Sequence, residues 1–107
     1  MAGVFIAEYD PAWAAAYYAI EARVRAALGR TVVAIEHVGS TSVPGLAAKP
    51  VIDVNLAVAV SAREEDYAPQ LEAAGFELAV REPEWFEHRM FKGRTRGKPA
   101  RLLPRLS

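Results

Sequence analysis

Hydrophobic residues recur at helical spacing in the first part of the chain. Between residues 11 and 28 they fall every third or fourth position, which places them on one face of an α-helix. Asp10 suits the N-cap of that helix, Pro11 suits its first position, and Gly29 marks its end. A second helix is expected over residues 61–74, where a proline predicts a kink or a break.

Four stretches are expected to form strands, the first because it is rich in β-branched residues and the second and fourth because their side chains alternate. These stretches cover residues 31–38, 51–60, 76–80 and 85–91. In the second stretch successive side chains point to opposite faces, so Asp53 and Asn55 share a face with small neighbours. The order helix, strand, strand, helix, strand, strand predicts one α/β (α+β) domain with a mixed, twisted sheet flanked by helices.

The composition is that of one folded domain. The chain has 107 residues, of which 52% are hydrophobic, and it has no cysteine. This length supports one core, and the lack of cysteine excludes disulfides and thiolate metal sites. No apolar run approaches the roughly 20 residues of a membrane span, and the first residues lack the pattern of a signal peptide. We therefore expect a soluble, cytoplasmic protein.

Charge is spread unevenly along the chain, although the formal net charge is zero. Residues 1–88 contain six basic and all 13 acidic residues, whereas residues 89–107 contain seven basic residues and no acid. The alternation also stops near Lys92, so we expect a domain over residues 1–92 and a basic, poorly ordered tail over residues 93–107. Two explanations of the tail stay open: a surface for RNA or acidic membranes, and a shifted reading frame in a GC-rich gene.

A Gly-Ser turn followed by a strand with one carboxylate is the candidate chemistry. Glycine at the Gly39-Ser40 turn lets the backbone approach a phosphate closely, although the dipeptide alone more often marks an ordinary tight turn. Asp53 interrupts an apolar strand, where an unpaired charge is costly. Its partner is either a cation such as Lys49 or Arg89, or a Mg²⁺ ion completed by waters and phosphates.

The polar residues around this pair leave several roles open. Asn55 offers a carbonyl oxygen in place of a second carboxylate, and Glu87 is the candidate for a further acid from a later strand. His37 and His88 are either bases, anion-binding groups or structural residues. Lys49 either contacts a phosphate or precedes the strand as a structural residue.

Three segments carry a resemblance to a known family: Tyr9–Trp13, Glu36–Pro50 with the following Ile52-Asp53, and Trp85–Arg89. On these segments the chain resembles the GrpB family, small proteins with a nucleotidyltransferase-like fold. The similarity extends from Glu8 to about Lys92. The resemblance therefore implies that fold for most of the chain.

Nucleotidyltransferase-like domains carry an hG[GS] turn and, after a short segment, a Dh[DE]h strand. Here Val38-Gly39-Ser40 is followed by 12 residues and then by Asp53-Val54-Asn55-Leu56, so the spacing fits and Asn55 replaces the second acid. The resemblance implies a nucleotide or a nucleotide-containing small molecule as the ligand and Mg²⁺ as the cofactor. The residues that it implies are Asp53 and Glu87 for catalysis, Asp53 and Asn55 for the metal, and Gly39, Ser40, Thr41, Lys49 and His37 for the phosphates.

Functions of different classes stay open. One is Mg²⁺-assisted nucleotide binding or nucleotidyl transfer; another is a non-catalytic binding or accessory module that retains the pocket. A related domain fused to dephospho-CoA kinase implies a link to coenzyme A or nucleotide chemistry. Family members commonly continue through an Asn-Leu-His-Val-like strand and an Arg-rich helix, and the sequence after Lys92 shows neither. A truncated, inactive product is therefore a third alternative.

Overall fold

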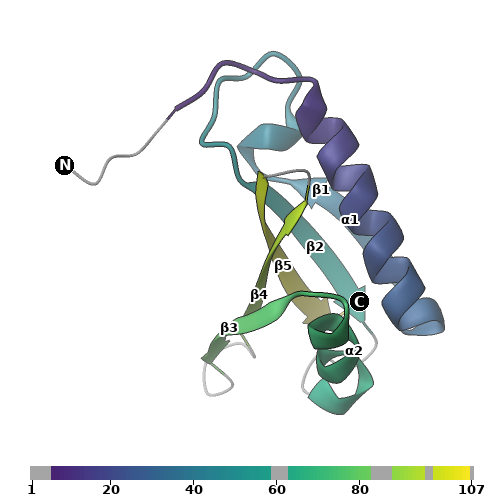
Figure 1. The fold of residues 1–107 in the computed structure, drawn as a ribbon. Coiled ribbons are helices and arrows are strands. Elements are labelled where there is room, and N and C mark those ends of the chain that lie inside the picture. Colours follow the sequence, from purple (N-terminus) through teal and green to yellow (C-terminus); the bar gives the residue numbers. More distant parts are fainter. Residues whose placement is uncertain (1–5, 59–62, 83–87, 96–97, 107) are drawn as a thin grey trace.

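The computed structural model describes residues 6–58, 63–82, 88–95 and 98–106 (Figure 1). Within these residues the elements follow one another as α1 (Ala12–Leu28), β1 (Ala34–Val38), β2 (Ile52–Val58), α2 (Ala68–Ala73), β3 (Glu77–Glu82), β4 (His88–Thr95) and β5 (Lys98–Leu106). Short 3-10 turns lie at Gly29–Thr31, Ser40–Ser42 and Glu64–Asp66. None of the described helices is long and apolar enough to cross a membrane.

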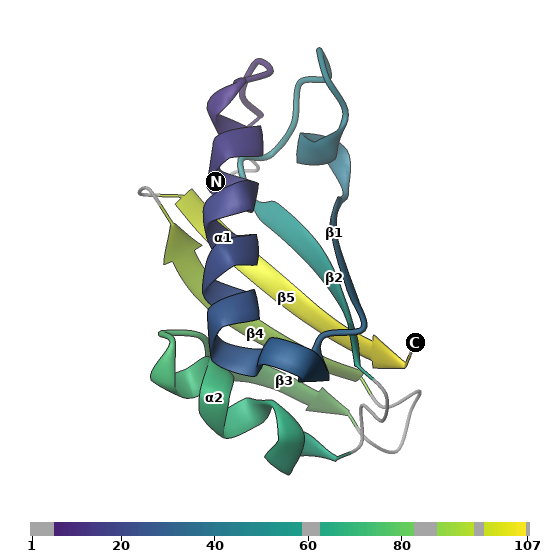
Figure 2. The same cartoon turned by 90° about the vertical axis from the view of Figure 1, so that its right-hand side faces the viewer.

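The strands form one mixed sheet in the order β1-β2-β5-β4-β3. β2 and β5 are parallel, and the other neighbouring strands are antiparallel. Figures 1 and 2 show that the sheet is twisted and that α1 and α2 lie on the same side of it. The predicted class, an α+β domain with a mixed, twisted sheet, is therefore confirmed.

Helix α1 covers the middle of the sheet because one of its faces is apolar. The buried residues of α1 are Trp13, Ala16, Tyr17, Ile20, Val24 and Leu28. Just before its start the Asp10 carboxylate accepts a hydrogen bond from the Ala12 amide at 2.9 Å, which satisfies an unpaired donor of the first turn, but the N-cap is Pro11, one residue later than predicted. On its exposed side Arg25 donates to Glu21 at 2.9 Å.

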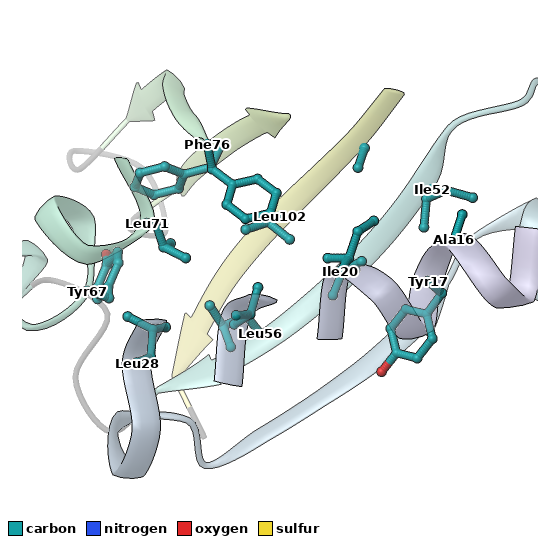
Figure 3. Close-up of a cluster of buried hydrophobic side chains, with 14 of the residues drawn as sticks. Ala16, Tyr17, Ile20, Leu28, Ile52, Leu56, Tyr67, Leu71, Phe76 and Leu102 are labelled. Atoms are coloured by element: carbon teal, nitrogen blue, oxygen red, sulfur yellow. The ribbon is translucent and has the colours of Figure 1, made fainter. Parts of the chain in front are cut away.

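The core lies between α1, α2 and the inner face of the sheet. Ile52 and Leu56 of β2 and Leu102 of β5 are 0% exposed and point toward α1 (Figure 3). Each fully buried side chain of this size contributes about 1.5–3 kcal/mol relative to an exposed one. Buried and half-buried residues alternate strictly along β2, so the half-buried side chains point away from the helices. We call this side of the sheet the helix-free face.

Arg23 joins three elements at one edge of this core. Its guanidinium donates to the carbonyl oxygens of Arg94 at 2.7 Å and Ala74 at 2.8 Å. It also lies 4.3 Å from the centre of the Phe76 ring, within the range of a cation–π interaction. Through these contacts α1 is fixed to the end of α2 and to β4.

The second helix is shorter than its sequence pattern predicts. A 3-10 turn over Glu64–Asp66 precedes α2, and Pro69 occupies the first turn of α2. Proline lacks the amide that a helix interior needs, so it is tolerated only near the start, and this position explains the predicted break. The expected start at Ser61 lies outside the described residues.

The expectation of a poorly ordered tail is wrong for residues 98–106, which form β5 between β2 and β4. Ala100 and Leu102 of β5 are 1% and 0% exposed. The end of β4 is equally well packed, because a Cβ atom on Gly93 would overlap the Phe76 ring. Residue 92 is therefore not the end of the folded domain.

Candidate functional site

The Gly39-Ser40 turn lies directly against Asp53. β1 ends at Val38, and Gly39 follows with φ 77° and ψ −174°, a conformation that is essentially restricted to glycine. A Cβ atom on Gly39 would lie 2.9 Å from Oδ2 of Asp53. Glycine is required here both by the backbone conformation and by the close approach. The structure thus brings the turn and the strand carboxylate together.

Asp53 pairs with Arg101, a residue that sequence analysis did not select. The two residues lie opposite each other in the β2–β5 ladder. Nε and Nη2 of Arg101 donate to Oδ1 and Oδ2 of Asp53 at 2.6 and 2.8 Å, and the two side chains are 42% and 19% exposed, respectively. These hydrogen bonds raise the pKa of Arg101 above its usual value despite its partial burial. Among the described side chains the partner of Asp53 is therefore Arg101 rather than Lys49, and the side chain of Arg89 lies outside the described part.

His37 and Thr41 hold the turn to the rest of the fold. His37 stacks on Tyr17 of α1, with ring centroids 5.0 Å apart. The Thr41 hydroxyl donates to the Val51 carbonyl oxygen at 3.0 Å, so it accepts from Nε2 of His37 at 2.9 Å, which assigns the imidazole proton to Nε2. Burial lowers the pKa of His37, although the negative charge of Asp53 raises it. The two side chains thus hydrogen-bond to each other and to the fold, and their predicted phosphate contacts stay predictions.

The other residues predicted for the site lie in different places. Ser40 is exposed at the start of the short 3-10 turn. Asn55 lies opposite Glu36 of β1 on the helix-free face. Lys49 is exposed in the segment that leads into β2. Glu87 lies outside the described residues, so its predicted catalytic role stays a prediction.

The described residues around Asp53 do not fit a resident Mg²⁺ ion. Mg²⁺ is usually held by carboxylates, waters and phosphates in a near-octahedral shell. Both carboxylate oxygens of Asp53 accept hydrogen bonds from Arg101, whose positive charge opposes a second cation at the same place. Among the described residues no three His, Asp or Glu side chains are placed to hold a metal ion. A metal ion at Asp53 would therefore compete with the charge of Arg101 for the same carboxylate.

Charged residues form a row across the helix-free face of the sheet. The strand registers align Asp53, Arg101, Lys92 and Glu77, one each from β2, β5, β4 and β3. Residues directly opposite each other in neighbouring strands point to the same face. Asp53 therefore lies at one end of a row whose centre is the two cations Arg101 and Lys92.

A pocket of about 650 Å³ lies at the end of this face where β2 and β5 begin. Its charged lining residues are Lys49, Lys92, Arg94, Arg101 and Glu77. We call it the basic pocket, because four of these five residues are cationic. Of the five, only Lys49 was predicted as a site residue, because Arg101 and Lys49 come close to Lys92 only when β5 enters the sheet.

The fold is that of a nucleotidyltransferase-like α+β domain. In it the Gly-Ser turn lies between two strands and contacts the carboxylate of the second strand. The structure is similar to the crystal structure of conserved protein GrpB from Enterococcus faecalis, with a TM-score of 0.81 and 26% sequence identity. That similarity covers 95% of this chain and 61% of the other chain.

The sequence comparisons agree with this class. The family model described as GrpB protein matches residues 3–103, and the chain therefore belongs to the GrpB family. A UPF0157 protein of Halalkalibacterium halodurans is 52% identical over 92 residues, and one of Streptomyces coelicolor is 54% identical over 78 residues. The matches cover 86% and 73% of this chain, but 47% and 41% of those proteins. The chain thus spans about half the length of these relatives.

A more distant similarity involves a protein with a named activity. A dephospho-CoA kinase of Mycolicibacterium paratuberculosis is 39% identical over 70 residues. The match covers 63% of this chain and 17% of the kinase. The similarity therefore involves a small part of that protein.

Proposed function

We propose that this GrpB domain binds a nucleotide and holds its phosphate groups at the Gly39-Ser40 turn. The observation that carries the proposal is the Asp53–Arg101 pair beside the turn. An unpaired Asp53 carboxylate would repel a phosphate, whereas Arg101 offsets its charge. Since both residues of the turn are exposed, an anion can then reach its backbone.

On this proposal the ligand binds without Mg²⁺. Asp53 acts as the counter-ion that orients Arg101, and the domain is a binding module. The second candidate is Mg²⁺-assisted nucleotidyl transfer, with Asp53 and Glu87 as catalytic carboxylates and Asn55 as a further metal ligand. The closeness of the turn to Asp53 favours that candidate. The two candidates differ in the role of Asp53: a counter-ion in one, a metal ligand in the other.

ATP, GTP and coenzyme A are the ligands to test first. Adenine and guanine nucleotides follow from the nucleotidyltransferase-like fold, which leaves the base open. Coenzyme A is added because one relative is named dephospho-CoA kinase, and coenzyme A also carries a diphosphate. A cytoplasmic location, where these compounds are abundant, belongs to the same proposal.

Calorimetric titration of the three ligands, with and without Mg²⁺, tests the phosphate-binding role of the turn. Ser40→Asp places a negative charge on an exposed side chain of the turn, and Ser40→Asn is its neutral control of similar size. We expect binding without Mg²⁺ that falls by about tenfold or more in Ser40→Asp and stays near the original value in Ser40→Asn. No binding of any ligand by the folded protein would refute the proposal.

Asp53→Asn separates the two roles of Asp53. The change keeps the side-chain shape and removes the charge that Arg101 neutralises. If Asp53 is a counter-ion, Arg101 then presents more positive charge, and the affinity for ATP without Mg²⁺ rises by roughly two- to tenfold. A loss of affinity that appears only in the presence of Mg²⁺ would instead identify Asp53 as a metal ligand. Circular dichroism of the variant checks that the fold is retained.

A further inference from the structure

We propose that the basic pocket binds the diphosphate group of a small-molecule ligand, with Lys49, Lys92 and Arg101 as its cations. The pocket is distinct from the Gly39-Ser40 turn, because neither turn residue lines it. The proposal therefore stands whether or not the turn itself binds phosphate. It adds a second anion-binding place to the helix-free face.

The size of the pocket suits a small molecule. Ligand-binding clefts usually enclose roughly 300–1,000 Å³, and the basic pocket has a volume of about 650 Å³. Its walls come from five parts of the chain: the segment before β2, the turn between α2 and β3, and the strands β3, β4 and β5. Because these parts are joined by the sheet, the lining residues are held at fixed positions before any ligand arrives.

The charges of the pocket are not balanced within it. Lys49 and Lys92 form no ion pair with a carboxylate in the part of the chain that the structure describes. Glu77 is the acid of the pocket and faces Lys92 across the β3–β4 ladder without forming an ion pair with it. Placing these cations around one cavity costs electrostatic repulsion, which a bound anion would relieve.

Arg101 links the pocket to Asp53. A guanidinium has five N–H donors in a rigid fork, and Asp53 uses the donors on Nε and Nη2. With 42% of its side chain exposed, Arg101 also lines the pocket. The pair with Asp53 therefore holds the guanidinium in one orientation, and the remaining donors can bind an anion at a low entropic cost.

A diphosphate matches this arrangement better than a nucleic acid does. Lys92 and Arg101 lie opposite each other on neighbouring strands, so they present two adjacent cations to two adjacent phosphates. Single-stranded nucleic acid is bound by aromatic platforms along an open groove. None of the described lining residues is aromatic, and the cations surround one cavity rather than a stripe.

The test is calorimetric titration of inorganic pyrophosphate into the protein at about 0.15 M salt without divalent cations, since that ionic strength screens exposed charges. We expect binding that falls by about tenfold or more in Lys49→Glu and in Lys92→Glu, because each places an anion at the wall of the pocket. Arg30→Glu is the matched control: it makes the same charge reversal on an exposed residue outside the pocket, and we expect near-original affinity.

The outcomes separate this proposal from the phosphate-binding role of the turn. If pyrophosphate still binds to Ser40→Asp but not to Lys92→Glu, the diphosphate binds in the pocket. This conclusion holds even if the protein does not bind ATP. Equal losses in Arg30→Glu and Lys92→Glu would show only general charge attraction and would overturn the proposal. Tighter binding of a short single-stranded RNA, not displaced by pyrophosphate, would overturn it as well. Circular dichroism confirms that each variant is folded before it is titrated.

Discussion

At the scale of single residues, the geometry of the candidate site depends on Gly39. Gly39→Ala adds a Cβ atom 2.9 Å from Oδ2 of Asp53 in a conformation that L-residues avoid. We expect the free energy of unfolding, measured by urea denaturation, to fall by about 1–3 kcal/mol. Gly45→Ala is the matched control, because Gly45 also has a positive φ of 83° but nothing within 4 Å of its Cβ position. Equal losses in both variants would show that the close approach to Asp53 contributes nothing.

His37 gives the site a pH dependence. Its pKa in the folded protein is lowered from 6.5 by burial, so below about pH 6.5 the unfolded chain binds more protons than the native state. The free energy of unfolding should therefore be highest above that pH and fall as the pH is lowered. His37→Phe keeps an aromatic ring against Tyr17 and removes the titration, so its stability should vary less between pH 7.5 and pH 5. An NMR titration that places the pKa of His37 above 6.5 would contradict this prediction.

The turn and Asp53 could be predicted from the sequence, but Arg101 could not. The difference depends on how far apart in the sequence the neighbouring residues are. Gly39, Ser40 and Asp53 are recognisable because a turn and the following strand are close in the sequence. Arg101 is 48 residues from Asp53, and only the register of β5 brings it there. Without that strand, Lys49 and Arg89 were reasonable partners for Asp53. The charge of Asp53 predicted that a partner exists, but not which residue it is.

At the scale of elements, the predictions succeeded where a segment has one clear period. α1 and β2 were predicted because their apolar residues follow a helical or an alternating pattern, and β1 because its segment is rich in β-branched residues. β5 was missed because Pro99 and Pro104 lie within it, and proline argues against a central strand since it has no amide to donate. Its buried residues Ala100 and Leu102 alternate with Arg101, but three residues are too few to establish a period.

At the scale of the whole molecule, β5 joins what would otherwise be two separate pairs of strands. β1 and β2 lie on one side of it and β4 and β3 on the other. β5 also brings together the two oppositely charged parts of the sequence, because its Arg101 pairs with Asp53 from the acidic part. Acidic and basic residues are thus separated along the sequence, and the fold brings some of them next to each other. The candidate site and the basic pocket both depend on this strand.

The dependence of the whole fold on β5 can be measured with one pair of variants. Leu102 is 0% exposed and contacts the core beneath α1, whereas the next residue, Leu103, points to the helix-free face and is half-buried. We expect Leu102→Ala to lower the free energy of unfolding by about 2–5 kcal/mol, because it removes core contacts and leaves a cavity. Leu103→Ala should cost clearly less, since less of its side chain is removed from water. Urea denaturation measures both. If neither variant changed the stability, residues 98–106 would contribute nothing to the fold, and the Asp53–Arg101 pair would lose the strand that positions it.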